Sequence, residues 1–158
     1  MLSIGNVAPL NIEVVDESGQ KTSLSRVLGQ PTVVYFYPKD NSPGCTKEAC
    51  SFRDYNEELE KLGVQVIGVS GDSYQSHVKF AQKHHLNFKL WSDPEKKLIN
   101  AFGAWGQKSM FGKTFLGIRR MTFALDETGK IIHIWPKVEA NQHAQEVWGF
   151  FNQLMSSK

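Results

Sequence analysis

Short apolar runs rich in β-branched and aromatic residues alternate with longer amphipathic segments along this chain of 158 residues. The clearest runs are residues 32–37 and 64–70, which are typical of strands buried inside a sheet. Between them a helical period extends over residues 45–62 or 46–62, and Gly63 is placed to end it. Two such strands joined by a helix favour a parallel pair, which restricts the chain to an α/β architecture.

The remaining segments continue this alternation. We expect a short strand over 11–15, a brief helix capped by Ser23, a helix from Ser73 or Ser76 to about 84, a short strand over 88–91, a helix from Pro94 to about 101, a hairpin of 117–126 and 130–135, and a last helix over 141–155. Residues 103–117, with their glycines and aromatic side chains, are expected to form an irregular loop. This order predicts a thioredoxin-like α/β fold, a central mixed β-sheet flanked by helices, in one domain over residues 1–158.

Composition and charge exclude several classes of protein. Net charge is +2 and no basic run exceeds two residues, which argues against nucleic acid or an anionic membrane as the main partner. The longest apolar stretch, residues 33–37, is far too short to span a bilayer. The N-terminal residues lack the basic and apolar regions of a secretory signal, so we expect a cytoplasmic location. Two cysteines do not make a disulfide scaffold, and in a reducing compartment such a pair is more often catalytic or metal-binding.

Cys45 has the sequence context of a reactive thiol. A buried strand ends at Pro38, a short polar loop follows, and Cys45 opens the next helix. The first turn of a helix carries unpaired N–H groups and the positive end of the helix dipole, and both favour the thiolate. The alternative is an unreactive core thiol that happens to start a helix.

Cys50, the second and last cysteine, lies on a different face of that helix. Cys45 shares the apolar stripe, whereas Cys50 lies beside Thr46, Arg53 and Glu57. Five helical residues separate Cα atoms by roughly 8 to 9 Å, and a disulfide requires less than about 7 Å. The two cysteines therefore cannot pair until the first turns of the helix unwind. The alternatives are an incidental small residue at 50 or a metal site, although the spacing of paired zinc ligands is missing.

The motif Pro38-x-x-x-Ser42-x-x-Cys45 resembles the active-site motif of the peroxiredoxins. The longer run over residues 37–50 resembles the bacterioferritin comigratory protein subfamily, also called peroxiredoxin Q. The resemblance extends over nearly the whole chain, at Gly5-x-x-Ala8-Pro9 and at residues 90–94, 102–105 and 117–123.

This resemblance implies a thiol peroxidase in which Cys45 attacks hydrogen peroxide or an organic hydroperoxide and becomes a sulfenic acid. Ser42, where the family more often has threonine, would hydrogen-bond the thiolate and the peroxide. Pro38 would close the pocket against water, although it also serves as a strand terminator. An arginine is expected beside the thiolate; strand parity alone does not choose between Arg119 and Arg120, and the family pattern selects Arg120.

The resemblance also implies that Cys50 resolves the sulfenic acid as an intramolecular disulfide, which thioredoxin would reduce. No cofactor or metal is expected, and the subfamily suggests a monomer, with a weak dimer through residues 103–117 as the alternative. Glu48 is interpreted as compensation of the helix dipole. Two other functions remain open: a disulfide oxidoreductase, whose chemistry usually requires Cys-x-x-Cys, and a redox sensor or holdase-type binding protein that unwinds on oxidation.

Overall fold

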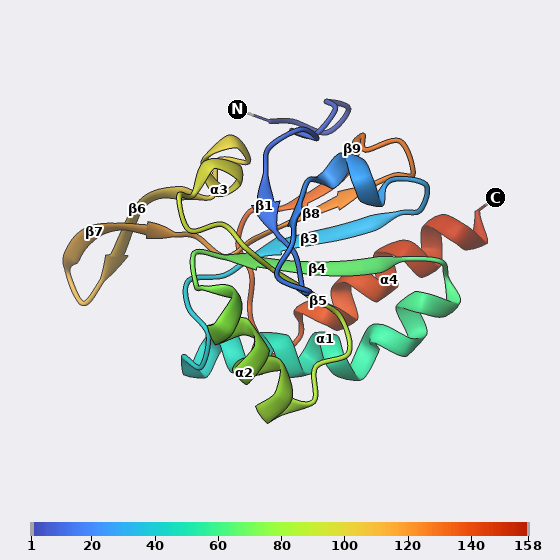
Figure 1. The fold of residues 1–158 in the computed structure, drawn as a ribbon. Coiled ribbons are helices and arrows are strands. Elements are labelled where there is room, and N and C mark those ends of the chain that lie inside the picture. The colour runs from blue at the N-terminus through green and yellow to red at the C-terminus, as the bar shows by residue number, and fades with distance from the viewer. Residues whose placement is uncertain (1, 158) are drawn as a thin grey trace.

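The computed structural model describes residues 2–157, and its centre is a seven-stranded mixed sheet in the order β2-β1-β5-β4-β3-β8-β9 (Figure 1). The strands are β1 (Val14–Val15), β2 (Lys21–Thr22), β3 (Thr32–Phe36), β4 (Gln65–Ser70), β5 (Lys89–Ser92), β8 (Met121–Leu125) and β9 (Ile131–Trp135). The helices are the 3-10 helix η1 (Leu24–Val27) and α1 (Pro43–Lys61), α2 (Tyr74–His84), α3 (Lys97–Ala101) and α4 (His143–Ser156). The expected α/β fold with a helix-flanked mixed sheet is confirmed.

Strand β3 lies at the middle of the sheet and is buried along its whole length. It pairs in parallel with β4 and antiparallel with β8, so its backbone groups are satisfied on both edges. Its side chains alternate between two apolar clusters. Val34 and Phe36 join the cluster under α3, whereas Val33 and Tyr35 join the cluster under α1, α2 and α4. The helices therefore cover both faces of the sheet, as Figure 1 shows.

Helix α1 follows β3 after a loop and begins two residues before the expected start. Pro43 occupies its first turn, where the missing N–H costs nothing, and Ser42 is the N-cap residue. The helix ends as predicted, because Gly63 adopts a positive φ of 78° and its N–H bonds back to the carbonyl of Glu60. The sequence predicted either Ser73 or Ser76 as the start of α2. Ser73 is the cap, because its side chain accepts a hydrogen bond from the Ser76 N–H.

The expectation of an irregular loop over residues 103–117 is wrong. This segment forms a separate two-stranded antiparallel ribbon, β6 (Trp105–Met110) and β7 (Lys113–Ile118), which projects from the main sheet beside α3 (Figure 1). Phe111 and Gly112 alone connect the strands, and both have positive φ, 53° and 79°. Positive φ at both central residues is typical of the hairpin turn that matches strand twist.

Three other boundaries also differ from the sequence prediction. Gly117 and Ile118 belong to β7 and β8 begins at Met121, so Arg119 and Arg120 lie between two strands and not on one. Helix α3 begins at Lys97 because Lys96 has a positive φ of 60° and ends a turn closed onto the Asp93 carbonyl. The first strand is only two residues long. Within residues 2–157, the structure has no helix with both the length and the apolar character needed to cross a membrane.

Candidate active site

Cys45 lies in the first turn of α1, directly after the loop that leaves β3. Its thiol is free and only 1% exposed, and it packs in the cluster under α1 beside Tyr35 and Tyr37. The Nη2 group of Arg120 donates a hydrogen bond to Cys45 Sγ at 3.1 Å. The sulfur therefore faces a fixed cation and the positive end of a helix dipole, and both stabilise negative charge on it.

The structure places the two neighbouring arginines in different surroundings. Arg120 contacts Cys45, whereas the guanidinium of Arg119 lies over Gly106, where a Cβ atom would collide with it. The approach of Arg120 depends on glycine in the same way, because a Cβ on Gly44 would lie 2.7 Å from Arg120 Nη2. Gly44 is thus required for the arginine to reach the sulfur, a role that sequence reasoning missed.

Glu48, interpreted from the sequence as compensation of the helix dipole, also belongs to this site. It lies one turn after Cys45, is 1% exposed, and accepts a hydrogen bond from Arg120 Nη1 at 3.1 Å. Its other oxygen is buried and has no hydrogen-bond partner among the described residues. Burial raises the pKa of Glu48 to about 7, and the charge of Arg120 opposes that rise. The sequence feature that could have placed Glu48 in this site was its spacing of three residues from Cys45.

Ser42 and Pro38 lie in the loop that precedes Cys45. The Ser42 hydroxyl donates to the Lys39 carbonyl at 3.0 Å, and not to Cys45 Sγ. Rotation of that hydroxyl is therefore needed for the role that the motif implies. Pro38 is half-buried and directly follows Tyr37, the last buried residue before the loop.

Asp40 fastens the same loop to α2 through a buried network that sequence reasoning missed. Its Oδ1 accepts a hydrogen bond from Tyr37 Oη at 2.7 Å, and its Oδ2 accepts one from Ser76 Oγ at 2.8 Å. The same Oδ2 lies 2.7 Å from His77 Nδ1, and His77 Nε2 lies 3.1 Å from the Trp91 carbonyl. These bonds join the loop, the start of α2 and the end of β5 in one rigid unit.

Asp40, Asp72 and His77 are the one group in the described part of the chain that could hold a metal ion. Their ligand atoms already have partners within the protein. Asp72 Oδ2 accepts from the Asp40 N–H at 2.8 Å and from Ser70 Oγ at 2.7 Å, and Asp40 Oδ2 faces His77 and Ser76. In this structure the three side chains serve an internal hydrogen-bond network.

Cys50 is a free, half-buried thiol on α1. It borders an open pocket of about 390 Å³ together with Lys47, Ser51, Asp54, Tyr55 and Asn141. Because α1 is continuous from Pro43 to Lys61, Cys45 and Cys50 face different sides of one regular helix. Bond formation between them requires the helix to unwind.

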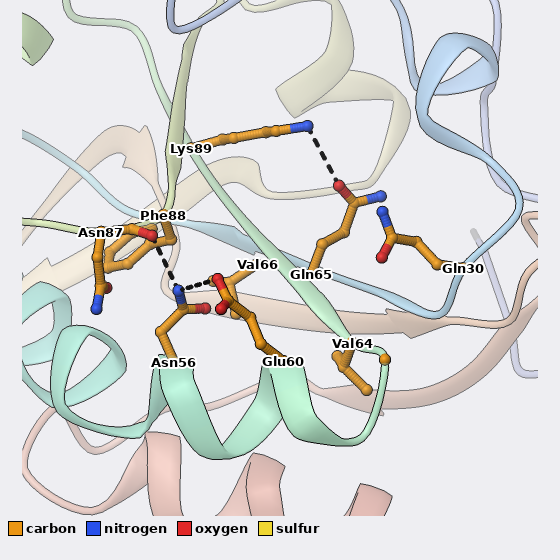
Figure 2. Close-up of a pocket in the computed structure, with 10 residues that line it drawn as sticks. Gln30, Asn56, Glu60, Val64, Gln65, Val66, Asn87, Phe88 and Lys89 are labelled. Atoms are coloured by element: carbon orange, nitrogen blue, oxygen red, sulfur yellow. Dashed lines mark hydrogen bonds between the residues drawn. The ribbon is translucent and has the colours of Figure 1, made fainter.

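A separate polar pocket of about 310 Å³ lies at the far end of α1 and includes neither cysteine. Figure 2 shows hydrogen bonds among the residues that line it: Asn56 Nδ2 donates to Glu60 and to the Asn87 carbonyl, and Lys89 Nζ donates to Gln65. Asn56 thereby joins α1 to the segment before β5, and the pocket adds nothing to the site at Cys45.

Comparison with known proteins agrees with this geometry. The chain matches the AhpC/TSA family over residues 4–134. It is 46% identical to peroxiredoxin Bcp of Bacillus subtilis over 145 residues, 92% of each chain, and 40% identical to peroxiredoxin Bcp of Escherichia coli strain K12 over 152 residues, 96% of this chain and 97% of that protein.

Solved structures give the same result. The fold is similar to that of bacterioferritin comigratory protein from Xanthomonas campestris, with a TM-score of 0.88 and 35% identity over 98% of both chains. It is also similar to peroxiredoxin Q of Xylella fastidiosa, with a TM-score of 0.89 and 34% identity over 99% of this chain and 98% of that one. A peroxiredoxin is a peroxidase that uses a peroxide substrate and a thiol reductant. The chain belongs to the AhpC/TSA family and, within it, to the Bcp or peroxiredoxin Q group of thiol peroxidases.

Proposed function

We propose that Cys45 is the residue that attacks the peroxide. The observation that supports this assignment is the 3.1 Å contact between Arg120 Nη2 and Cys45 Sγ at the N-terminus of α1. The thiolate attacks one peroxide oxygen and the O–O bond breaks. Cys45 becomes a sulfenic acid, and the other oxygen leaves as water or an alcohol after it takes up a proton. Hydrogen peroxide and organic hydroperoxides are the proposed substrates; the Xanthomonas relative is described for alkyl peroxide reduction.

The neighbouring residues have supporting roles in this proposal. Arg120 stabilises both the thiolate and the charge that develops on the leaving oxygen. Ser42 turns its hydroxyl from the Lys39 carbonyl to the bound peroxide, and Pro38 keeps water out of the space beside the sulfur. The methyl group of the more usual threonine is missing at Ser42, so its rotation is less restricted.

Cys50 completes the oxidative half of the cycle. Once α1 unwinds, the Cys50 thiolate attacks Cys45 Sγ, the sulfenic oxygen leaves as water, and a Cys45–Cys50 disulfide forms. A dithiol protein of the thioredoxin type then reduces this disulfide by thiol exchange. In this proposal the protein is a monomer and acts in the cytoplasm, where the reductant keeps both cysteines as thiols.

A coupled assay tests the proposal by following NADPH oxidation in the presence of thioredoxin, thioredoxin reductase and peroxide. Cys45→Ser is expected to abolish turnover. Cys50→Ser is expected to reduce one equivalent of peroxide per chain and then stop, because thioredoxin has no disulfide to attack. Unchanged turnover in Cys45→Ser would refute the assignment. A wild-type protein that consumes a single equivalent of peroxide would instead point to a redox sensor or holdase.

A further inference from the structure

A pocket of about 310 Å³ lies beside Arg120 and is strongly positive. Its lining consists of Lys108, Ser109, Arg119, Arg120, Pro136, Lys137 and Val138. Four of these seven residues are cations and none is acidic. The cations come from three separate segments, namely β6, the connection between β7 and β8, and the residues after β9, so the fold gathers them from distant parts of the sequence.

The positive charge of this pocket is poorly compensated. Among the ion pairs of the described residues, only Arg120 of the four cations takes part, and its partner is the buried Glu48. Lys108 is held in place by donating to the Ile118 carbonyl at 2.9 Å. Burial and the neighbouring charge of Arg120 both lower the pKa of Lys108, while the nearby Cys45 acts in the opposite direction. A bound anion would relieve this repulsion between like charges.

The pocket is connected to the reacting sulfur through a single side chain. Arg120 lines the pocket and also donates to Cys45 Sγ. The guanidinium of Arg120 therefore lies between a small molecule in this pocket and the Cys45 thiolate. Pro136 and Val138 add apolar surface next to the cations. The surroundings suit a molecule with an anionic group and a short alkyl chain, long enough for its reactive end to pass Arg120 and reach Cys45.

We propose that this pocket binds the carboxylate of hydroperoxides that carry one, and that the protein therefore prefers anionic alkyl hydroperoxides to neutral ones. The proposal rests on the proposed function of Cys45 as the attacking thiolate. The chemical step is unchanged: the S–O bond forms, the O–O bond breaks, and the alkoxide takes up a proton. The carboxylate is not altered, because it serves only to hold the alkyl chain with its peroxide toward the sulfur.

The experiment compares two hydroperoxides that differ only at the carboxyl group, the anionic 4-hydroperoxy-4-methylpentanoate and its uncharged methyl ester. The second-order rate constant of Cys45 oxidation is measured for each by stopped flow, and their ratio is the readout, so a general loss of reactivity cancels. We expect the wild type to favour the carboxylate by about twofold to fivefold, the effect of one screened charge pair. Higher ionic strength should lower the ratio.

Lys137→Gln and Arg119→Gln should each move the ratio toward one. Lys83→Gln, which removes the same charge from the exposed end of α2, is the matched control and should leave the ratio at the wild-type value. A second measurement does not need turnover: an NMR titration of the reduced protein with the product, 4-hydroxy-4-methylpentanoate. Its binding should be weaker in Lys137→Gln than in Lys83→Gln.

A wild-type ratio near one would overturn the proposal, and so would a ratio that stays unchanged in Lys137→Gln and Arg119→Gln. So would variants that keep the ratio but are recycled more slowly by thioredoxin, because the cations would then serve an acidic surface of the reductant. If neither hydroperoxide oxidises Cys45, the proposed function is wrong, and the NMR titration still decides whether the pocket binds a carboxylate.

Discussion

Asp40 Oδ2 lies 2.7 Å from His77 Nδ1, and this buried contact ties the loop before Cys45 to helix α2. In the proposed cycle α1 unwinds to let Cys50 reach Cys45, and we expect the loop at the N-terminus of α1 to move with it. Asp40 therefore favours the folded form that attacks peroxide and opposes the unwound form that makes the disulfide. Loss of one buried hydrogen bond of this kind costs about 1–3 kcal/mol, enough to change the balance between the two forms severalfold or more.

We predict that His77→Gln, whose amide replaces Nε2 but not the Nδ1 that contacts Asp40, shifts this balance toward the unwound form. Cys45 should react with peroxide several times more slowly, whereas the disulfide should form faster once the sulfenic acid exists. Less sulfinic acid should accumulate at high peroxide concentration, because overoxidation competes with disulfide formation. Mass spectrometry of Cys45 after graded peroxide doses measures the sulfinic fraction. Hydrogen exchange of residues 38–48 reports the unwinding directly, and unchanged exchange there would contradict the prediction.

Gly44→Ala should separate activity from stability. The new Cβ would lie 2.7 Å from Arg120 Nη2 and displace the guanidinium from Cys45 Sγ. We expect peroxidase activity to fall by about tenfold or more, since the loss of one preorganised donor costs this much or more in other enzymes. Helix propensity alone would favour alanine by roughly 0.5–1 kcal/mol.

Gly149→Ala in α4 is the matched control, because a Cβ there meets nothing within 4 Å. It should gain stability from helix propensity and keep full peroxidase activity. Thermal unfolding and the thioredoxin-coupled assay on both variants make the comparison. If Gly44→Ala retains wild-type turnover, peroxidase activity does not depend on the observed position of Arg120.

The sequence was informative where local signals agreed with one another. Strands β3 and β4, the period of α1 and the stop at Gly63 were predicted because propensity, pattern and capping all indicate the same element. The ribbon of β6 and β7 was missed because its turn is Phe111-Gly112, without the Asn-Gly or Asp-Gly that announces such turns. A non-glycine residue with positive φ is held there by strand pairing, which leaves no mark in the local sequence.

The candidate site also contains residues that the sequence could predict and residues that it could not. Cys45 and its motif are contiguous in sequence, so they could be recognised. The burial of Glu48 could not be predicted, because a charged residue is seldom buried unless it is paired, and its partner Arg120 is distant in the sequence. Asp40 and His77 are 37 residues apart, and nothing local signals their contact. The family pattern selected Arg120 over Arg119, and Arg120 is the arginine that contacts Cys45; strand parity could not decide, since neither residue lies on a strand.

Glu48→Gln should remove a charge that appears beside Cys45 near neutral pH. Burial raises the pKa of Glu48 to about 7, so in the wild type its charge appears near neutral pH beside the thiol. A second negative charge there opposes the thiolate and competes for Arg120. In the variant, the rate of Cys45 alkylation should no longer change as residue 48 ionises near pH 7, because the amide is neutral at every pH. The pH profile of Cys45 alkylation by iodoacetamide measures it, with Glu57→Gln on the exposed face of α1 as control. Identical profiles for Glu48→Gln and the wild type would exclude this coupling.

Glu48 and His143 should change the pH dependence of stability in opposite directions. His143 is buried with Nε2 2.7 Å from Thr122 Oγ1, and burial lowers its pKa to about 4. Because the unfolded state binds the proton more readily, His143 makes the fold more stable as pH rises from 4 to 6.5.

Glu48, with its raised pKa, acts in the opposite direction between pH 4.5 and 7, where the folded state holds the extra proton. Each effect amounts to about 3 kcal/mol, so they nearly cancel in the wild type between pH 4.5 and 6.5. Urea unfolding should show that Glu48→Gln gains stability with rising pH across this window, whereas His143→Gln loses it. Parallel pH dependences in the two variants would show that these groups do not carry the proton linkage of the fold.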